Sequence, residues 1–410
     1  MTRFVLGSLF LNCQDQIYSE EYSDFIGNRS LIESKYALDC KQPLGTMFAS
    51  LYLKLSDGYE DGTVYGYYNI PKLFGLQDTG SMESSGILQV RENPDLKLDG
   101  SGVLIGFVDT GIDYAGSIFL KQDGTTRVIA IWDQIIPAES PIRLPELPTT
   151  LENITRTPEG FLYGSEFTHE QLNVAVKMED AYEGISSRDE NGHGTFLASI
   201  AAGNELPDGS FTGAAPKADI AMVKLKPAKN RLRAYYQIKE DAVAYQENDI
   251  MAGVLYLVSL AKKRQQPLVI CLGLGTNAGS HRGSLPLARM LEDLGSSVGI
   301  TIVAGTGNET SRGHHFEGQI SSESGYEDVE IRVAEGENGF FLELWASAPE
   351  TYSVAIRSPN GEVIPRIYVR PGRIEILNFA LAQTRVELSY RLSVTGTGEF
   401  LALLRFINIT

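Results

Sequence analysis

Between residues 96 and 312, short apolar runs alternate with longer helical stretches, and this alternation is the feature that most limits the possible folds. It is typical of an α/β domain in which helices cover a parallel sheet. The strand candidates are Val103–Val108, Ile220–Leu225, Leu268–Leu274 and Ile300–Ala304. The longest helical candidate is Asp249–Arg264, and Pro267 follows it before the next strand. We therefore expect a parallel sheet with flanking helices.

The pattern of apolar and turn-forming residues changes on both sides of this region. Residues 1–95 are mixed, with one strand-like run at Met47–Leu55, so we expect a separate α+β segment there. After residue 313, short β-prone runs follow one another with Gly, Pro, Asn and Asp between many of them, which predicts an antiparallel sandwich or jelly roll. These runs are Glu327–Val333, Phe340–Ala346, Ser353–Arg357, Ile364–Val369, Ile374–Phe379, Arg385–Val394 and Phe400–Ile407. Three domains are expected, at residues 1–95, 96–312 and 313–410.

Charge and cysteine content exclude several classes of protein. The formal net charge of −17 argues against nucleic acid or an anionic membrane as the main partner. No run approaches the ~18 apolar residues of a membrane span, and no convincing export signal stands at the N-terminus, so cytoplasm or spore interior is the default location. The three cysteines, Cys13, Cys40 and Cys271, are scattered and odd in number, so neither a disulfide framework nor a zinc site is implied.

Asp109 stands in the motif Val-Asp-Thr-Gly directly after an apolar strand candidate. In open α/β sheets, functional residues gather beyond the carboxyl ends of the strands. Gly111 lets the backbone turn sharply at this point. The structural alternative is an aspartate that merely caps the following turn.

His193 stands in the motif Asn-Gly-His-Gly-Thr, which opens an Ala-rich helical stretch. Gly192 and Gly194 remove side chains on both sides of it, so another group can approach the imidazole. The positive end of the helix disfavours a protonated ring, which suits a neutral general base. Together with Asp109 upstream, this motif predicts catalytic ancestry.

Val-Asp-Thr-Gly also resembles the signature of aspartic proteases. Their chemistry needs two such carboxylates that share a proton. The later His-Gly-Thr motif has no place in that scheme, so we rank this alternative low.

The two motifs in this order resemble the aspartate and histidine segments of the subtilisin family of serine proteases. The resemblance implies that Asp109 orients His193, which acts as the general base. Asn308, after the strand Ile300–Ala304 and Gly305, matches the residue that stabilises the oxyanion. Leu272–Gly275 matches the strand that borders the substrate, and the implied substrate-binding residues are Gly273, Leu274, Gly275 and Gly305. The implied partner is a peptide or protein substrate.

The local sequence is most similar to the clostridial spore-germination branch of this family, which carries a jelly-roll insertion. That similarity implies that residues 1–95 act as a propeptide, which templates folding and inhibits the cleft. No cofactor is implied; calcium is possible by family analogy, with no site in view.

The nucleophile segment that the family requires, Gly-Thr-Ser before a helix of small residues, occurs nowhere in the 410 residues. Two interpretations stay open. Either the chain is a protease whose serine lies in a lost portion, or it is a pseudoprotease that binds peptides or regulates a sister protease. In both cases the chain as written is expected to have no triad-dependent turnover.

Overall fold

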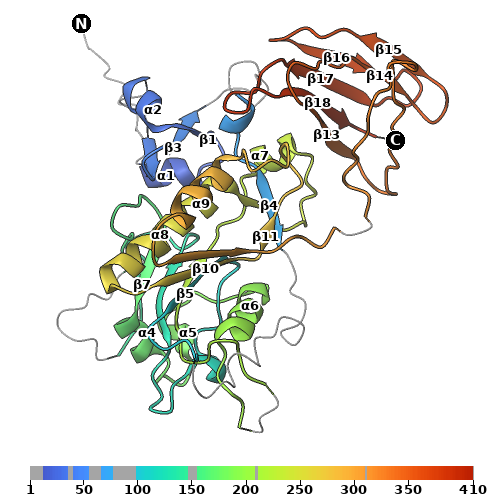
Figure 1. The fold of residues 1–410 in the computed structure, drawn as a ribbon. Helices are drawn as coiled ribbons and strands as arrows, with labels where there is room; N and C mark the ends of the chain where they lie inside the picture. Colours follow the sequence, from blue (N-terminus) through green and yellow to red (C-terminus); the bar gives the residue numbers. More distant parts are fainter. Residues whose placement is uncertain are drawn as a thin grey trace, which may run out of the picture.

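The computed structural model describes residues 13–35, 40–54, 66–76, 98–145, 155–207, 211–309 and 312–409. Its centre is a six-stranded sheet in the order β12-β10-β5-β8-β6-β7. Figure 1 labels β5, β7 and β10 of this sheet. The strands are β5 (Leu104–Asp109), β6 (Val128–Asp133), β7 (Ser165–Thr168), β8 (Asp219–Lys224), β10 (Leu268–Leu272) and β12 (Ile300–Ala304). All neighbours run parallel except β7, which pairs antiparallel with β6. The predicted α/β fold with a parallel sheet is confirmed.

Helices cover both faces of this sheet, because its central strands are apolar at consecutive positions, which point to opposite sides. In β5, Leu104 and Val108 share a core with helix α8, while Ile105 and Phe107 share one with helix α6. The helices of this region are α4 (His169–Ala175), α5 (Ala181–Gly184), α6 (His193–Ala202), α7 (Asn230–Tyr235), α8 (Glu247–Arg264) and α9 (Pro286–Gly295), with a 3-10 turn, η3, at Ser117–Phe119.

Strand β12 has the predicted bounds, and β5 and β8 lie within one residue of theirs. The predicted run Leu268–Leu274 divides into β10 and a two-residue strand, β11 (Leu274–Gly275). Strands β6 and β7 were not predicted, although β6 is a fully buried run. Strand β11 belongs to a small antiparallel sheet in the order β11-β4-β9, with β4 at Leu73–Leu76 and β9 at Tyr245–Gln246.

The described residues before residue 77, here called the N-terminal unit, form a three-stranded antiparallel sheet in the order β1-β3-β2. Its elements are α1 (Cys13–Tyr18), β1 (Tyr22–Asn28), α2 (Arg29–Lys35), β2 (Cys40–Leu44), β3 (Phe48–Lys54) and the 3-10 turn η2 (Tyr67–Asn69), ahead of β4. Ile26 and Tyr52 join the core that contains α8, whereas Phe25 and Leu51 pack with Leu232 of α7. Both faces of the small sheet are therefore covered.

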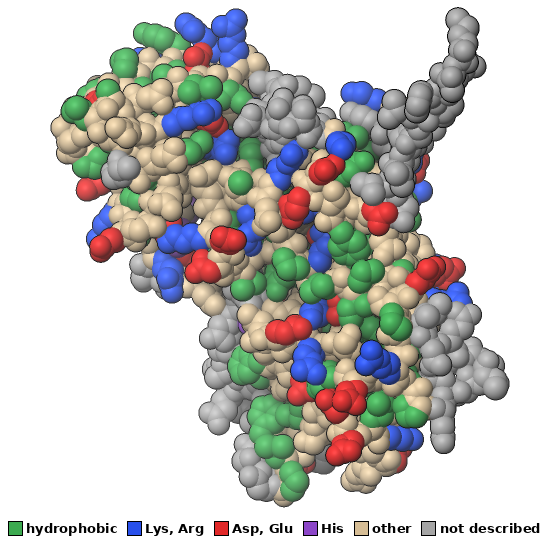
Figure 2. Space-filling view, turned by 180° about the vertical axis from the view of Figure 1, so that it is seen from behind, with side chains coloured by type: hydrophobic (Ala, Val, Ile, Leu, Met, Phe, Trp, Pro, Cys, Tyr) green, Lys and Arg blue, Asp and Glu red, His purple; other side chains and the backbone are tan. Residues whose placement is uncertain are grey.

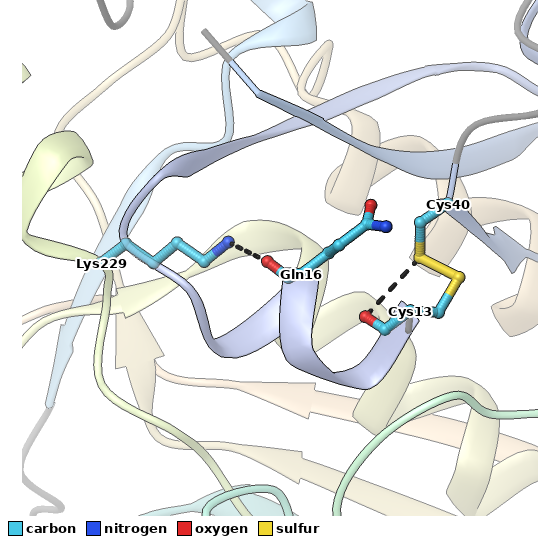
Figure 3. The surroundings of a disulfide bond; sticks show 4 residues. All are labelled: Cys13, Gln16, Cys40 and Lys229. Carbon is cyan, nitrogen blue, oxygen red and sulfur yellow. Dashed lines mark hydrogen bonds between the residues drawn. A yellow bond between two sulfur atoms is a disulfide. The ribbon is translucent and has the colours of Figure 1, made fainter. Parts of the chain in front are cut away.

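The expectation that the cysteines form no disulfide is wrong for two of them. Cys13 in α1 and Cys40 in β2 form a disulfide, with Cα atoms 5.3 Å apart (Figure 3). The two residues are 27 apart in sequence, and the packing of β2 beside α1 brings them together. Cys271 in β10 is a free cysteine.

One buried ion pair joins the N-terminal unit to the α/β domain, and a second lies within that domain. Asp24 of β1 is fully buried and pairs with Lys229. The Nζ atom of Lys229 also donates to the carbonyl oxygen of Tyr22 and to that of Gln16, the second of which is drawn in Figure 3. Lys226 pairs with the buried Asp249 of α8, with Nζ 2.7 Å from Oδ2. Since an isolated buried charge is costly, each partner depends on the other.

Residues 339–409, here called the β-rich unit, form a four-stranded antiparallel sheet and a two-stranded sheet that share one core. The strands are β13 (Gly339–Ala346), β14 (Val354–Arg357), β15 (Val363–Ile367), β16 (Ile374–Asn378), β17 (Arg385–Arg391) and β18 (Phe400–Ile407). The larger sheet has the order β13-β18-β17-β16. The predicted strand Glu327–Val333 is wrong: this stretch is exposed throughout and pairs with no strand among the described residues.

Basic and acidic side chains are interspersed over the face seen in Figure 2, with hydrophobic side chains between them. Within the described ranges, no helix has the length and apolar character needed to cross a lipid bilayer.

Candidate functional site

Asp109 is the last residue of β5, the strand between β10 and β8 near the middle of the sheet. Its side chain is 1% exposed. The backbone turns at Gly111, where φ is +132°, and a Cβ atom there would lie 3.1 Å from the carbonyl oxygen of Arg188. The turn thus needs a glycine both for its backbone conformation and for its close contact with the segment that precedes His193.

His193 is the first residue of helix α6, and the loop before it is organised by Asp189. The Oδ1 atom of Asp189 accepts from the backbone N–H of Asn191 and Gly192, and Oδ2 accepts from the N–H and hydroxyl of Thr195. Burial acts to raise the pKa of Asp189, but these hydrogen bonds outweigh it and hold the pKa below its ordinary value. An ionised Asp189 therefore caps the start of the helix.

The aspartate and the histidine meet side chain to side chain. Asp109 Oδ1 lies 2.8 Å from His193 Nδ1 and also accepts from the N–H of Thr110 at 2.7 Å. A neutral imidazole with its proton on Nδ1 presents its basic lone pair at Nε2. The hydrogen bond therefore fixes the orientation of the ring in the way that a general base requires.

Two threonines hold the strand end and the helix start together. The Thr110 hydroxyl donates to Asp189 Oδ1 at 2.7 Å and accepts from the N–H of Gly194 at 2.9 Å. Thr195 Oγ1 accepts from the N–H of Asp113 at 2.9 Å. These contacts and the role of Asp189 were not predicted, although an aspartate just ahead of a helix start is a recognisable capping pattern.

The glycines around His193 act differently from the prediction. Gly194 does not make room beside the imidazole; a Cβ atom there would lie 2.2 Å from the carbonyl oxygen of Gly111. Gly192 adopts a left-handed conformation, with φ at +89°, just before the helix. Gly194 thus permits close backbone packing, and Gly192 permits the turn.

Gly273, predicted to border the substrate, packs against the pair itself. A Cβ atom on Gly273 would lie 2.3 Å from Leu197 Cδ1, 3.0 Å from His193 Cε1 and 3.2 Å from Asp109 Oδ2. That Oδ2 atom is buried and has no hydrogen-bond partner in the described part of the chain. The absent side chain at residue 273 therefore accommodates the aspartate–histidine pair.

Leu274 and Gly275, the other predicted substrate-binding residues, pair with a strand of the N-terminal unit. Leu274 lies opposite Leu76, and Gly275 lies opposite Gly75. This strand is β4, which pairs with β9 on its other side, so β4 is the middle strand of the three-stranded sheet. An extended segment of this chain thus occupies the edge that sequence assigned to an extended peptide.

Asn308 and Gly305 follow β12, which runs parallel to β10 and β5. The N–H of Gly305 donates to the carbonyl oxygen of Leu272, beside Gly273, at 3.2 Å. Asn308 is exposed at the same edge of the sheet as Asp109, but within the described residues it makes no hydrogen bond to Asp109 or His193. The structure brings the pair and Gly273 together, and the role of Asn308, which follows the edge strand β12, stays a prediction.

A hollow of 370 Å³ lies beside the pair, between the loop before α6 and the residues that lead into β9. Thr110 and Asn191 line it on the side of the pair, and Val243 and Tyr245 line it on the side of β9. Lys224 stands in its wall and donates to Glu190 Oε2 at 2.7 Å. The hollow therefore lies next to the strand end that carries Asp109, although neither Asp109 nor His193 lines it.

Other chemistries find less support around this site. No cluster of three or more His, Cys, Asp or Glu residues in the described ranges could hold a metal ion. A second Asp-Thr-Gly stands at residues 78–80, outside the described residues, and the partner of Asp109 is His193.

A model of the subtilase family matches residues 100–340, more than half of the chain, and the chain belongs to that family. It is similar to two subtilisin-like proteases of Arabidopsis thaliana. SBT3.8 is 31% identical over 133 residues, which cover 30% of this chain and 16% of the plant protein, and SBT3.1 is 32% identical over 143 residues, with the same two shares. Among solved structures, the CspB protease of Clostridium perfringens is similar with a TM-score of 0.63 and 26% identity, over 80% of this chain and 61% of that one. The chain thus spans less than a fifth of the plant relatives and about three fifths of the clostridial structure.

Proposed function

We propose that this chain carries the aspartate and histidine half of a serine endopeptidase site, in which peptide bonds are cut through an acyl-enzyme. The observation that carries the proposal is the 2.8 Å contact between Asp109 Oδ1 and His193 Nδ1, at the carboxyl edge of the sheet and beside Gly273. Asp109 would orient the ring and stabilise its protonated form. His193 would take the proton of a serine hydroxyl and later give it to the leaving amine.

Asn308 is proposed as the donor to the oxyanion, a contribution worth ~3 kcal/mol in sites of this kind. Its support is its place after β12, at the same edge of the sheet as Asp109. The serine itself would come from residues beyond these 410, since no Gly-Thr-Ser occurs among them. The substrate is a peptide or protein that enters as an extended strand.

We also infer that the N-terminal unit is a propeptide and that β4 is its inhibitory strand. Strand β4 lies where an extended substrate would pair with β11 and β9. It ends at Leu76, opposite Leu274 and thus one residue from Gly273, which touches His193. The bond to be cut is therefore expected within a few residues after Leu76, closer than the boundary at residue 95 that composition suggested.

The test is to express the longest reading frame that contains these 410 residues and to follow self-cleavage by mass spectrometry. We expect a single cut shortly after Leu76, and loss of that cut in Asp109→Ala and His193→Ala variants by at least about a thousandfold. Glu375→Ala, on the far edge of the β-rich unit, is the matched control. A cut that persists in His193→Ala would refute the assigned roles.

The second candidate is a non-catalytic protein that binds peptides or a sister protease. The same β11-β4-β9 sheet favours it, because strand addition needs no nucleophile. A reading frame without a downstream Gly-Thr-Ser segment, together with an uncut product, would decide for this candidate.

A further inference from the structure

The segment that leads into β4 is held by three parts of the protein. It begins at Gly66, includes η2 (Tyr67–Asn69) and ends at Lys72, directly before β4. Tyr67 is 5% exposed although it lies on a short turn. Its hydroxyl donates to Glu343 Oε1 on β13 of the β-rich unit. Burial, followed by the charge of Glu343, raises the pKa of Tyr67 well above its ordinary value, so the hydroxyl stays a donor.

Glu343 uses both carboxylate oxygens. While Oε1 accepts from Tyr67, Oε2 accepts from the N–H of Gly279 at 2.8 Å and from Trp345 Nε1 at 2.9 Å. Gly279 belongs to the loop that follows β11, the strand paired with β4. One carboxylate thus connects the N-terminal unit, the loop after β11 and the β-rich unit. Hydrogen bonds to an ionised acceptor are stronger than neutral ones.

Aromatic packing surrounds this carboxylate. The Tyr67 ring meets Trp345 edge-on, with centroids 5.0 Å apart, and Tyr68 stacks on Trp345 at 6.3 Å. The Tyr68 hydroxyl lies 2.6 Å from Ser284 Oγ, in the same loop as Gly279. The segment is therefore enclosed between the β-rich unit and the loop after β11.

The other end of the segment is fixed from inside the molecule. Lys72 is fully buried, and its Nζ donates to the carbonyl oxygens of Tyr67 and Ile70 at 2.7 Å each. Its backbone N–H donates to Glu247 Oε2, and its carbonyl oxygen accepts from the N–H of Glu247. Movement of β4 out of its place between β9 and β11 would have to break these contacts of Lys72 and the contacts of Glu343 together.

We propose that the β-rich unit is a clamp, in which Glu343 and Trp345 grip Tyr67 and Tyr68 and thereby retain β4 between β9 and β11. The proposal rests on the proposed function, in that β4 is taken to block the substrate edge. It assigns to the β-rich unit control over release of the N-terminal unit. Departure of β4 from its place between β9 and β11 then requires that β13 and η2 separate.

The release rate of the N-terminal unit tests the clamp in the full chain. A recognition site for a specific protease is placed between residues 80 and 90, the chain is immobilised through its C-terminus and cut, and release of the N-terminal fragment is followed. Tyr67→Phe removes one hydroxyl and keeps the ring, and Glu343→Gln replaces an acceptor oxygen by an NH2 group. We expect each to speed release by about ten- to a hundredfold.

Glu375→Gln is the matched control, because β16 is the opposite edge strand of the same sheet. It should release the fragment at the unaltered rate. Release of both Tyr67→Phe and Glu343→Gln within twofold of the unaltered chain would overturn the clamp. If Glu343→Gln does not fold, an unchanged release rate in Tyr67→Phe alone is enough to overturn it.

Binding of a labelled peptide Leu-Phe-Gly-Leu after release separates this proposal from the one on which it rests. Faster release in the two variants, with no peptide bound by the opened chain, would retain the clamp and refute β4 as a substrate mimic. Peptide binding with unchanged release rates would retain the mimic and refute the clamp.

Discussion

Replacing Asp24 by alanine should loosen the N-terminal unit far more than any surface change in it. Asp24 Oδ1 pairs with Lys229 Nζ, and Oδ2 accepts from Gln246 Nε2 at 3.0 Å and from Asn248 Nδ2 at 3.2 Å. All four side chains are buried. The substitution leaves a buried ammonium without its carboxylate, and breaking a buried pair in this way costs about 3–5 kcal/mol.

Hydrogen exchange read by mass spectrometry is the suitable assay, because it reports the opening of β1 and β3 separately from the rest of a multi-domain chain. A loss of 3–5 kcal/mol corresponds to exchange faster by about a hundred- to several-thousandfold. The control is Glu21→Ala, which removes the same charge from an exposed pair with Lys54 and should leave exchange unchanged. The double variant Asp24→Leu, Lys229→Met should recover most of the stability that Asp24→Ala loses, because it removes both buried charges. Exchange of Asp24→Ala within tenfold of the unaltered protein would refute the reasoning.

Three further predictions concern the site. Gly273→Ala should destabilise the protein by about 1–3 kcal/mol in urea unfolding, because its methyl group would lie 2.3 Å from Leu197 Cδ1, and an added Leu197→Ala should restore part of that loss. Burial, followed by the charge of Asp109, raises the pKa of the Cys271 thiol to about 11. At pH 8 this thiol should therefore react with a disulfide reagent roughly a hundredfold more slowly in the folded protein than in the urea-unfolded protein. Equal reaction rates in the two states would contradict this prediction. Asp189 has a folded pKa below its ordinary value, so its stabilisation is present above pH 4 and is lost as the pH falls through the lowered pKa. The difference in thermal midpoint between Asp189→Asn and the unaltered protein should therefore be larger at pH 7 than at pH 3, and a constant difference would speak against it.

The sheet could be predicted where strands are both apolar and bounded by turn residues. Strand β12 agrees with its prediction at both ends, because Gly299 precedes it and Gly305 follows it. Strand β7 could not be found, because its four residues form an edge pairing that only the neighbouring β6 specifies. The error at Glu327–Val333 has the same origin: β propensity gives no strand without a partner.

The pair at the site was predictable because its two motifs stand at positions with fixed geometry, a strand end and a helix start. The contacts of Thr110 with Asp189 and Gly194 could not be read from sequence, since they depend on how strand and helix approach each other. The same holds for β4 beside β11, which joins residues about 200 positions apart, and for the disulfide of the N-terminal unit.

The core shared by the N-terminal unit and α8 has a consequence for biosynthesis. Ile26 and Tyr52 leave the ribosome long before Val254 and Leu257 of α8, against which their face of the sheet is packed. Until some two hundred more residues have been translated, that apolar face lacks the part of its native cover that α8 supplies. A nascent chain halted before α8 should therefore display it to chaperones, and one that has passed α8 should not.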